Sequence, residues 1–259
     1  MARWPARCTV PGWMFVVGLA LACPVAQAAR VNHLFIDESQ LVPEGGVELE
    51  QWVWAQGRIP DVIGRPASIW VWWGPVVAVS SHLELQLPLQ LTSFPDVTYL
   101  HSIELVARYR LFPREQDEGL QPLFRVAYGQ PLSGESGPPT FEASAVVTYG
   151  NLTSVRVTAN AGVRLGLPFL QSSAQGTTSV LGLVGAGLSV PVGKEFRLAA
   201  EFFSQFPIHG TPRPNFDQFY LGPSIAWSKG PFWVTFGSLF GLTSDSYRFL
   251  PKILWAVAL

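Results

Sequence analysis

The feature that most constrains this chain is the alternation of apolar and polar residues in TSVRVTANAGVRLGL, residues 153–167. From Val155 to Leu167 every second residue is apolar, whereas Arg156, Asn160 and Arg164 lie at positions between them. A period of two belongs to a β-strand, in which successive side chains point to opposite faces. The stretch therefore predicts a strand with one wholly apolar face and one polar face.

Similar alternating segments recur along the chain with turn residues between them, which predicts an all-β protein. We count twelve, and an even number is what a bacterial single-chain membrane barrel requires. The segments span residues 46–56, 67–78, 81–92, 99–112, 120–131, 140–150, 153–167, 178–191, 194–206, 216–228, 231–242 and 247–259.

The composition indicates where the apolar faces go. Charged residues make up 14% of the chain and hydrophobic residues 48%, with 10 Trp and 17 Phe, whereas an ordinary soluble domain is about 25% charged. So little charge is poorly suited to a water-exposed surface and favours a lipid-facing one. The net charge of −1 gives no basic surface for nucleic acid, so we expect no nucleic-acid partner.

The N-terminus predicts export. Arg3 and Arg7 precede an apolar run at 14–22, and AQA at 26–28 fits a cleavage site, so residues 1–28 are interpreted as a signal peptide. An alternative reading makes LALAC a lipoprotein box acylated at Cys23. We expect residues 29–45 to form a short periplasmic segment, with a partial plug of the lumen as the alternative, and residues 46–259 to form the barrel.

Membrane insertion by helices is not expected after residue 28. The longest apolar run, IWVWWGPVVAV at 69–79, falls well short of the roughly 20 residues that a spanning helix needs. A chain that crosses the membrane without helices must form a closed barrel. We therefore predict a transmembrane up-and-down antiparallel β-barrel of about 12 strands in the bacterial outer membrane.

The connections between segments alternate in length, as they do in outer-membrane barrels. Short ones lie at 79–81, 150–152, 192–194 and 229–230. Longer ones rich in Pro, Gly and Ser lie at 58–67, 92–100, 129–140, 168–178 and 207–217. The acidic connection at 113–119 is an exception, because it is longer than a periplasmic turn requires. The alternation of short and long connections still favours a membrane barrel, since a soluble sandwich has no reason to follow it.

Alternation alone does not say which face points outward, because a soluble barrel would place the apolar face inside. The aromatic residues favour the membrane arrangement, since they share the apolar face and often lie near segment ends, as interfacial girdles do. They are Tyr109, Tyr128, Phe141, Tyr149, Phe219, Trp227, Phe232 and Trp255.

Three stretches resemble a known family. LVPEGGVELEQWVWA at 41–55, SIELVARYRLF at 102–112 and QPLFRVAYGQPLSG at 121–134 are similar to the first strand and a hairpin of the putative outer-membrane transporters of the meta-pathway of phenol degradation. Leu100, His101 and Ser102 stand where that family usually has a Gly-Asp pair. The resemblance implies a barrel that moves small organic compounds.

The last strand, KILWAVAL, bears on assembly. Ile253, Trp255, Val257 and Leu259 form its outward row, and the outer-membrane assembly machinery reads an amphipathic last strand of this kind. Leu259 replaces the usual terminal aromatic residue. The expected partners are therefore the lipid bilayer, the assembly machinery and small solutes.

The polar faces predict what lines the lumen. If the apolar rows face lipid, ten charged side chains point inward. They are Arg108, Arg110, Arg125, Arg156, Arg164, Arg197, Glu84, Glu104, Glu142 and Glu201. A 12-stranded barrel lies between small, filled barrels and wide porins, so these side chains either line a narrow pore that prefers anions or form an ion-paired plug.

Enzymatic chemistry is not expected. The four histidines have no metal-ligand spacing, and His101 and Ser102, as neighbours in a strand, should point to opposite faces and form no dyad. GLVGAG at 182–187 lacks the order of a dinucleotide fingerprint and fits small residues inside a barrel strand. We expect no cofactor and no metal. The expected function is a channel or transporter for small solutes. The alternative is a closed barrel without an open pore that has a structural role or binds partners through its loops, and a barrel enzyme is the third possibility.

Overall fold

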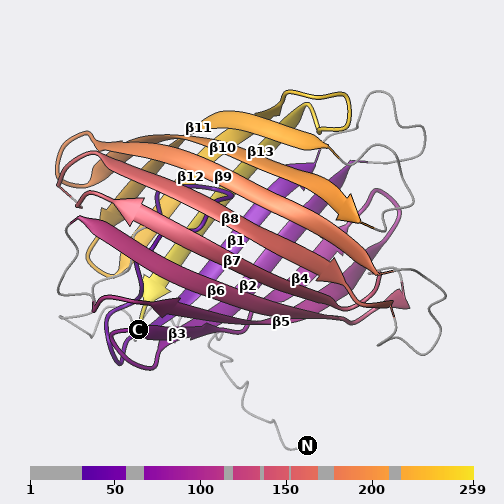
Figure 1. The fold of residues 1–259 in the computed structure, drawn as a ribbon, viewed down its shortest axis with the longest axis horizontal. Coiled ribbons are helices and arrows are strands. Elements are labelled where there is room, and N and C mark those ends of the chain that lie inside the picture. Colours follow the sequence, from indigo (N-terminus) through magenta and orange to yellow (C-terminus); the bar gives the residue numbers. More distant parts are fainter. Residues whose placement is uncertain are drawn as a thin grey trace, which may run out of the picture.

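The computed structural model describes residues 31–56, 67–113, 119–134, 137–151, 153–168, 178–209 and 217–259. These residues form one antiparallel sheet and no α-helix (Figure 1). Its strands are β1 (Val47–Gln56), β2 (Ser68–Ala78), β3 (Leu83–Gln86), β4 (Leu89–Ser93), β5 (Thr98–Arg110), β6 (Leu120–Pro131), β7 (Thr140–Tyr149), β8 (Arg156–Gly166), β9 (Ser179–Pro191), β10 (Phe196–His209), β11 (Gln218–Lys229), β12 (Phe232–Gly241) and β13 (Phe249–Ala258).

The sheet closes on itself. From β5 to β13 each strand pairs with its sequence neighbours, and β1 pairs with β13 on one side and β2 on the other. β3 and β4 both pair with β2 and with β5, so they are two halves of one interrupted strand. The closed wall therefore has twelve strands, which confirms the predicted fold class.

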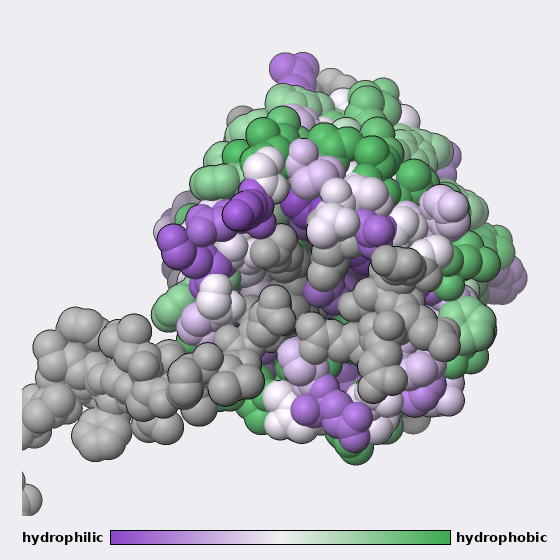
Figure 2. All heavy atoms as spheres, turned by 90° about the vertical axis from the view of Figure 1, so that its left-hand side faces the viewer, coloured by the Kyte–Doolittle hydropathy of each residue, from purple (hydrophilic) through white to green (hydrophobic). Residues whose placement is uncertain are grey.

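The apolar rows face outward. Leu105, Tyr109, Val157 and Phe236 are each about half exposed on the outer surface, while Arg108, Arg156 and Thr235, which alternate with them, are buried inside. Figure 2, which looks onto the end of the barrel that carries the C-terminus, shows hydrophobic residues over the outer wall and polar residues gathered at the end face. Residues exposed in this pattern match a lipid-facing belt.

The two ends of the barrel differ. Short turns at 79–82, 150–155, 192–195 and 230–231 lie at the end that holds the C-terminus, which we call the turn end. The strand ends that most of the longer connections join lie at the opposite end, which we call the loop end. The expected long connection at 92–100 is wrong, because the hairpin continues to the pair Ser93–Thr98. The turn beyond this pair is closed by a 2.8 Å hydrogen bond that the Phe94 N–H donates to the Val97 carbonyl.

Some predictions lie outside the described residues. They include the signal peptide at 1–28 and residues 114–118 of the acidic connection at 113–119. Among the described residues, no helix is long and apolar enough to cross a membrane, a result that does not bear on strands.

Candidate functional site in the barrel lumen

The N-terminal segment, residues 31–46, lies inside the barrel at the turn end. Asn32, His33, Leu34, Ile36 and the run 38–42 are all buried. The expectation of a periplasmic tail at 29–45 is therefore wrong for residues 31–42, whereas Glu44 and Gly45 are exposed. The physical reason is that a 12-stranded wall leaves an interior too wide for its own side chains to fill, and this segment supplies the missing atoms. We call it the plug segment.

The plug segment sits against a groove of glycines on β9. A Cβ atom built on Gly185 would lie 2.3 Å from Ile36 Cγ2, and one built on Gly187 would lie 2.5 Å from His33 Cε1. Any larger residue at these positions would occupy the space of the segment. Within GLVGAG, Gly185 and Gly187 therefore face the lumen and give the segment room, whereas Ala186 is exposed on the outer surface.

One carboxylate of the wall holds the tip of the plug segment. Glu201 on β10 accepts hydrogen bonds from three successive backbone N–H groups, those of Leu34 (2.6 Å), Phe35 (2.9 Å) and Ile36 (3.3 Å). The next N–H, that of Asp37, donates to Asn160 Oδ1 at 2.8 Å. Buried backbone donors need partners, and here the wall provides them.

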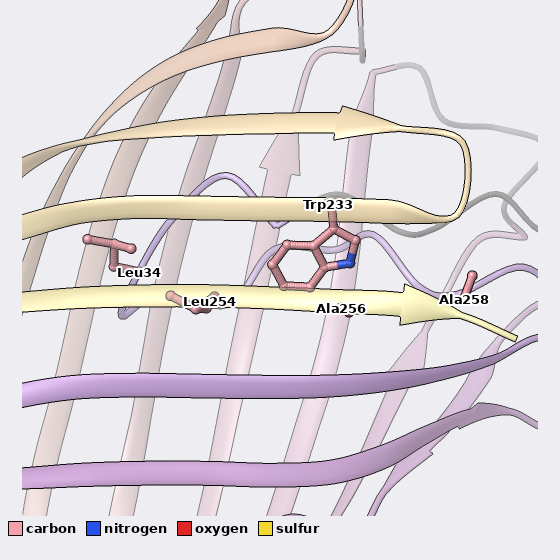
Figure 3. Close-up of a cluster of buried hydrophobic side chains, with 5 residues drawn as sticks. All are labelled: Leu34, Trp233, Leu254, Ala256 and Ala258. Atoms are coloured by element: carbon pink, nitrogen blue, oxygen red, sulfur yellow. The ribbon is translucent and has the colours of Figure 1, made fainter. Parts of the chain in front are cut away.

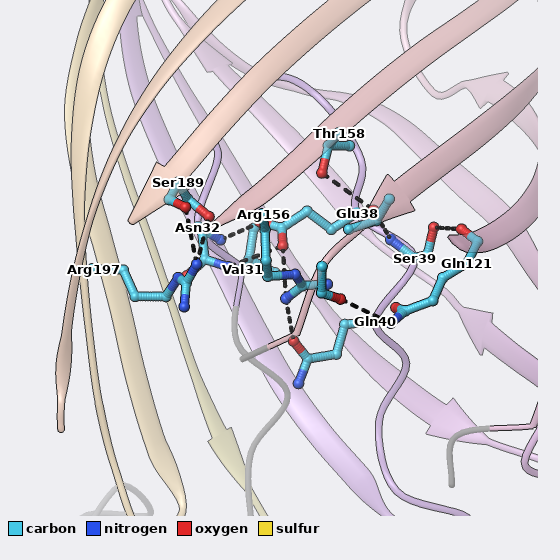
Figure 4. Close-up of polar contacts among 12 residues, drawn as sticks. Val31, Asn32, Glu38, Ser39, Gln40, Gln121, Arg156, Thr158, Ser189 and Arg197 are labelled. Atoms are coloured by element: carbon cyan, nitrogen blue, oxygen red, sulfur yellow. Dashed lines mark hydrogen bonds and ion pairs between the residues drawn. The ribbon is translucent and has the colours of Figure 1, made fainter. Parts of the chain in front are cut away.

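A second polar cluster ties the two arms of the segment together (Figure 4). Glu38 accepts hydrogen bonds from the backbone N–H and side-chain amide of Asn32, at 2.6 and 2.9 Å. Arg156 on β8 lies 3.3 Å from the Glu38 carboxylate and donates to Gln40 Oε1 at 3.2 Å. The segment is thus folded back on itself as well as bound to the wall.

Arginines of β5 bind the backbone of the plug segment. Arg108 pairs with Glu84 at 2.7 Å and also donates to the carbonyl of Glu38 (2.5 Å) and that of Gln40 (3.1 Å). Glu84 in turn accepts the Val42 N–H at 2.8 Å. Arg110 reaches the Ser39 carbonyl at 3.5 Å. These side chains serve as hydrogen-bond partners for a chain that has no sheet neighbour.

Apolar contacts complete the seat. Leu34 packs with Trp233 and Leu254 on the inner face of β12 and β13 (Figure 3), Leu41 packs with Leu123 and Val146, and Val42 packs with Val76 and Ala78. Each buried side chain of this size contributes roughly 1.5–3 kcal/mol relative to exposure. The plug segment therefore has a core of its own within the lumen.

Beside the plug segment a cavity of about 440 Å³ remains, extending toward the loop end. Residues 33–38 line it from the plug side, and Gln56, Pro131, Pro138 and Gln205 line it near the loop ends of their strands. The volume is within the range of small-molecule sites, about 300–1,000 Å³.

One wall of the cavity is charged. Arg125 on β6 and Arg164 on β8 both contact the Glu142 carboxylate on β7; Arg164 does so at 2.6 and 2.8 Å, and Arg125 pairs with its other oxygen. Arg125 also lies 3.5 Å from Asp37 of the plug segment. Arg164 has the most exposed side chain of this cluster, at 42%. These charges are largely balanced within the protein, so the cavity is less cationic than six inward arginines suggested.

The opposite wall is aromatic. Trp52 stacks on Trp72 with ring centroids 4.7 Å apart, and Trp54 stacks on Trp70 at 5.6 Å. Lys252 on β13 places its ammonium 4.5 Å from the Trp52 ring and 4.3 Å from the Phe35 ring of the plug segment, and it also donates to the Leu34 carbonyl. Cation–π contacts of this kind are worth about 0.5–2 kcal/mol.

His101 and Ser102 both line the cavity, so the expectation that they point to opposite faces is wrong. The register shifts between the pairs Gln90–Ser102 and Leu91–Leu100, which leaves His101 at a bulge, and a bulge breaks the alternation of faces. His101 packs edge-on to Trp70 at 4.7 Å, and the Ser102 hydroxyl donates to Gln90 at 2.9 Å. Their contacts are with wall residues rather than with each other.

All ten predicted charged residues lie on the inner face, and they fall into groups. Arg108, Arg110, Arg156, Glu84 and Glu201 contact the plug segment; Arg125, Arg164, Glu104 and Glu142 line the cavity; Arg197 donates to Ser154 and Ser189 near the turn end. The sequence interpretation missed Trp52, Trp54, Trp70, Trp72 and Lys252. The alternation within β1 could have revealed two of them, because Trp52 and Trp54 lie on the same face of the strand as Glu48 and Glu50.

A closed 12-stranded wall with an apolar outer surface and a polar, partly filled lumen has the architecture of an outer-membrane β-barrel. No family model matches the sequence, and no curated protein matches it. The structure is similar to the COG4313 outer membrane channel from Pseudomonas putida F1, with a TM-score of 0.61 and 10% identity over 88% of this chain and 100% of that one.

Two further solved structures are similar in fold. The NanC porin has a TM-score of 0.57 and 4% identity, covering 82% of this chain and 98% of that one. The translocator domain of the autotransporter NalP from Neisseria meningitidis has a TM-score of 0.50 and 14% identity, covering 82% and 88%. At these identities the likeness establishes the fold. The three are described as a channel, a porin and a translocator domain rather than as enzymes.

Proposed function

We propose that this protein is an outer-membrane channel for small solutes that is closed at its turn end by the plug segment. One observation carries the proposal: a separate segment of chain fills the lumen there, and a cavity of about 440 Å³ remains beside it. Side chains of the wall cannot leave the lumen. A segment attached at one end to β1 can leave once its polar contacts are exchanged for water.

The inward arginines have two roles in this proposal. Arg108, Arg110 and Arg156 position the plug segment, because they donate to its carbonyls and side chains. Arg125 and Arg164 shape the cavity through which a solute passes. Arg197 supports the turn end by binding Ser154 and Ser189. Arginine suits both roles because its planar fork stays charged and makes several hydrogen bonds at once.

We further propose membership in the outer-membrane transporter family of the meta-pathway of phenol degradation. The stretches at 41–55, 102–112 and 121–134 support it, and they correspond here to the end of the plug segment with β1, to β5 and to β6. The assembly machinery is the proposed partner for insertion, through the outward row of β13.

The second candidate is a closed barrel with a structural or binding role. The observation that favours it is the pairing of the lumen charges, since Arg108 with Glu84 and Arg125 with Glu142 satisfy one another. A permanently closed barrel would need no cavity, whereas a channel needs both the cavity and a segment that can move.

The deciding experiment compares the chain 29–259 with a variant that lacks residues 31–42, both refolded and inserted into planar bilayers. We expect small or infrequent conductance steps from the first and large, steady steps from the second. Adding a synthetic peptide of residues 31–42 should reduce the conductance of the deletion variant. If the deletion variant folds and inserts but conducts no ions, the channel proposal is wrong and the closed barrel remains.

A further inference from the structure

The aromatic wall of the cavity already holds one cation. The ammonium of Lys252 lies 4.5 Å from the centre of the Trp52 ring and 5.4 Å from that of Trp54, and the ring of Phe35 in the plug segment lies 4.3 Å away. The face of an aromatic ring carries negative partial charge, so it attracts a positive group. Lys252 is only 6% exposed. The wall therefore stabilises an ammonium group that is largely removed from water.

The other half of this wall has the same chemistry without a cation. Trp72 stacks on Trp52, Trp70 stacks on Trp54, and all four rings line the cavity. In the described part of the chain, no lysine or arginine lies over the ring of Trp70 or Trp72. Tryptophan makes stronger cation–π contacts than tyrosine or phenylalanine. These two rings can therefore hold a second cation, one that does not belong to the protein.

Two carboxylates flank the tryptophans. Glu50 lies on the inner face of β1 and is 9% exposed, and Glu104 lies on β5 and is partly buried. Both side chains line the cavity. Along the wall between them lie Gly74, opposite Glu50, and Pro88, whose carbonyl accepts the Glu104 N–H. Neither of these two residues has a polar side chain that could bind a carboxylate.

In the described chain, neither carboxylate has an arginine or lysine within ion-pairing distance. The other lumen charges pair with one another: Arg108 with Glu84, Arg156 with Glu38, Arg125 with Glu142 and Asp37, and Arg164 with Glu142. Of the carboxylate, guanidinium and ammonium groups that line the described cavity, those left without an ion pair are Glu50, Glu104 and Lys252. A carboxylate removed from water is costly to leave unpaired. The cavity therefore lacks a positive charge, although its arginines alone suggest a site for anions.

We propose that the cavity binds a small organic cation with a quaternary ammonium group, held by Trp70, Trp72, Glu50 and Glu104. The methyl groups of the ammonium lie on the indole faces, and the two carboxylates supply the compensating negative charge. A quaternary ammonium has no N–H, so it is recognised by aromatic faces and nearby charge rather than by hydrogen-bond acceptors. The cavity of about 440 Å³ accommodates such a solute. The inference rests on the proposed channel, because it names the class of solute that the channel admits.

The test compares three solutes of similar shape and different charge. Choline is the cation, its analogue with a tert-butyl group in place of the trimethylammonium group is the uncharged solute, and tert-butylacetate is the anion. Each is titrated calorimetrically into the chain 29–259 folded in detergent micelles. We expect choline to bind roughly ten-fold more tightly than the uncharged analogue, and tert-butylacetate to bind more weakly than either. Equal affinities for choline and the analogue, tighter binding of tert-butylacetate, or no binding of choline would overturn the proposal.

A pair of tryptophan variants tests the aromatic half of the site. Trp72→Leu keeps an apolar side chain but removes the ring face, so it should weaken choline binding roughly ten-fold. The matched control is Trp73→Leu, which changes the neighbouring ring on the outer surface, where Trp73 is 47% exposed. It should leave choline binding unchanged. Resistance to added protease verifies that each variant is folded, and equal affinities in the two folded variants would show that choline does not bind on this wall.

A pair of glutamate variants tests the charged half. Glu104→Gln keeps the shape of the side chain and removes its charge, so it should weaken choline binding several-fold and leave the affinity for the uncharged analogue unchanged. The control is Glu195→Gln, because Glu195 does not line the cavity. An unchanged preference for choline over the analogue in Glu104→Gln would contradict the role of this carboxylate.

The result is separable from that of the channel, because binding is measured in folded barrels and needs no conductance. If the variant that lacks residues 31–42 conducts ions but the unmodified chain binds no choline, the channel proposal stands and the cation site is wrong. If choline binds as expected but that variant conducts no ions, the channel proposal is wrong and the cation site belongs to a closed barrel with a binding role.

Discussion

The carboxylate of Glu201 on the barrel wall accepts a 2.6 Å hydrogen bond from the backbone N–H of Leu34, 167 residues earlier in the chain. The same carboxylate also binds the next two N–H groups. Hydrogen bonds to a charged group are worth roughly 1.5–3 kcal/mol each. This single side chain is therefore the strongest point of attachment for the tip of the plug segment.

Replacing Glu201 with Gln should loosen the plug segment. The amide keeps the shape but loses the charge, and its NH₂ group cannot accept a bond from the backbone. A loss of about 1.5–3 kcal/mol corresponds to a population of released segment roughly 10–150-fold larger. Single-channel recording should show longer open times. The matched control is Glu195→Gln, which removes an exposed pair with Lys229 (3.2 Å) and should leave open times unchanged; equal effects from both variants would contradict the assignment.

Replacing Gly187 with Leu should expel the plug segment by filling its seat. A Cβ at this position already lies 2.6 Å from Ile36 Cδ1, so a leucine side chain cannot fit while the segment is bound. We expect conductance close to that of the deletion of residues 31–42, and cleavage of the freed segment by added protease. Gly134→Leu is the control, because a Cβ there meets nothing within 4 Å. A Gly187→Leu barrel that stays closed would show that the segment is not seated in this groove.

Low pH should release the plug segment through Glu38. Burial alone would raise the pKa of the Glu38 carboxyl, but attraction to Arg156 and His33 and the hydrogen bonds from Asn32 hold it below 4.5. Because the pKa of Glu38 is lower when the plug segment is seated than when it is released, the ionised carboxylate stabilises the seated state. This stabilisation is complete above about pH 4.5, the pKa of the free group, and is lost as pH falls through the lowered pKa. Conductance should rise on acidification below about pH 4.5.

The variant Glu38→Gln isolates this contribution from those of other carboxylates. It should open more often at neutral pH and respond less to acidification. An unchanged pH profile in this variant would assign the response to another group.

The two groups of arginines should give different phenotypes. Arg156→Gln weakens the contacts with Glu38 and Gln40, so we expect more frequent opening with little change in ion preference. Arg164→Gln removes a partly exposed cation from the cavity wall, so we expect a shift of reversal potential toward cation preference with unchanged open probability. Reversal potentials in a salt gradient and open times, measured together, separate the outcomes. Matching phenotypes in both variants would contradict the division of roles.

The wall of this protein is determined by local sequence. Strict alternation in β8 and β13, together with the low charge, predicts which residues face lipid, because side chains of a strand alternate whatever the strand pairs with. That rule also places Arg108, Arg156 and Glu201 inside. It fails at His101, where a bulge shifts the register, and at 92–100, where the hairpin extends further than its Pro and Ser residues suggest.

The contents of the lumen were decided by tertiary structure. Residues 31–46 have no strand pattern, and nothing local shows that Leu34 meets Glu201 or that His33 and Ile36 rest on Gly187. These contacts exist because closing twelve strands creates an interior that the wall cannot fill. The sequence by itself determined a barrel with inward charges; only the closed wall determined that five of those ten charges hold a segment of the same chain, that four line a cavity and that Arg197 binds Ser154 and Ser189.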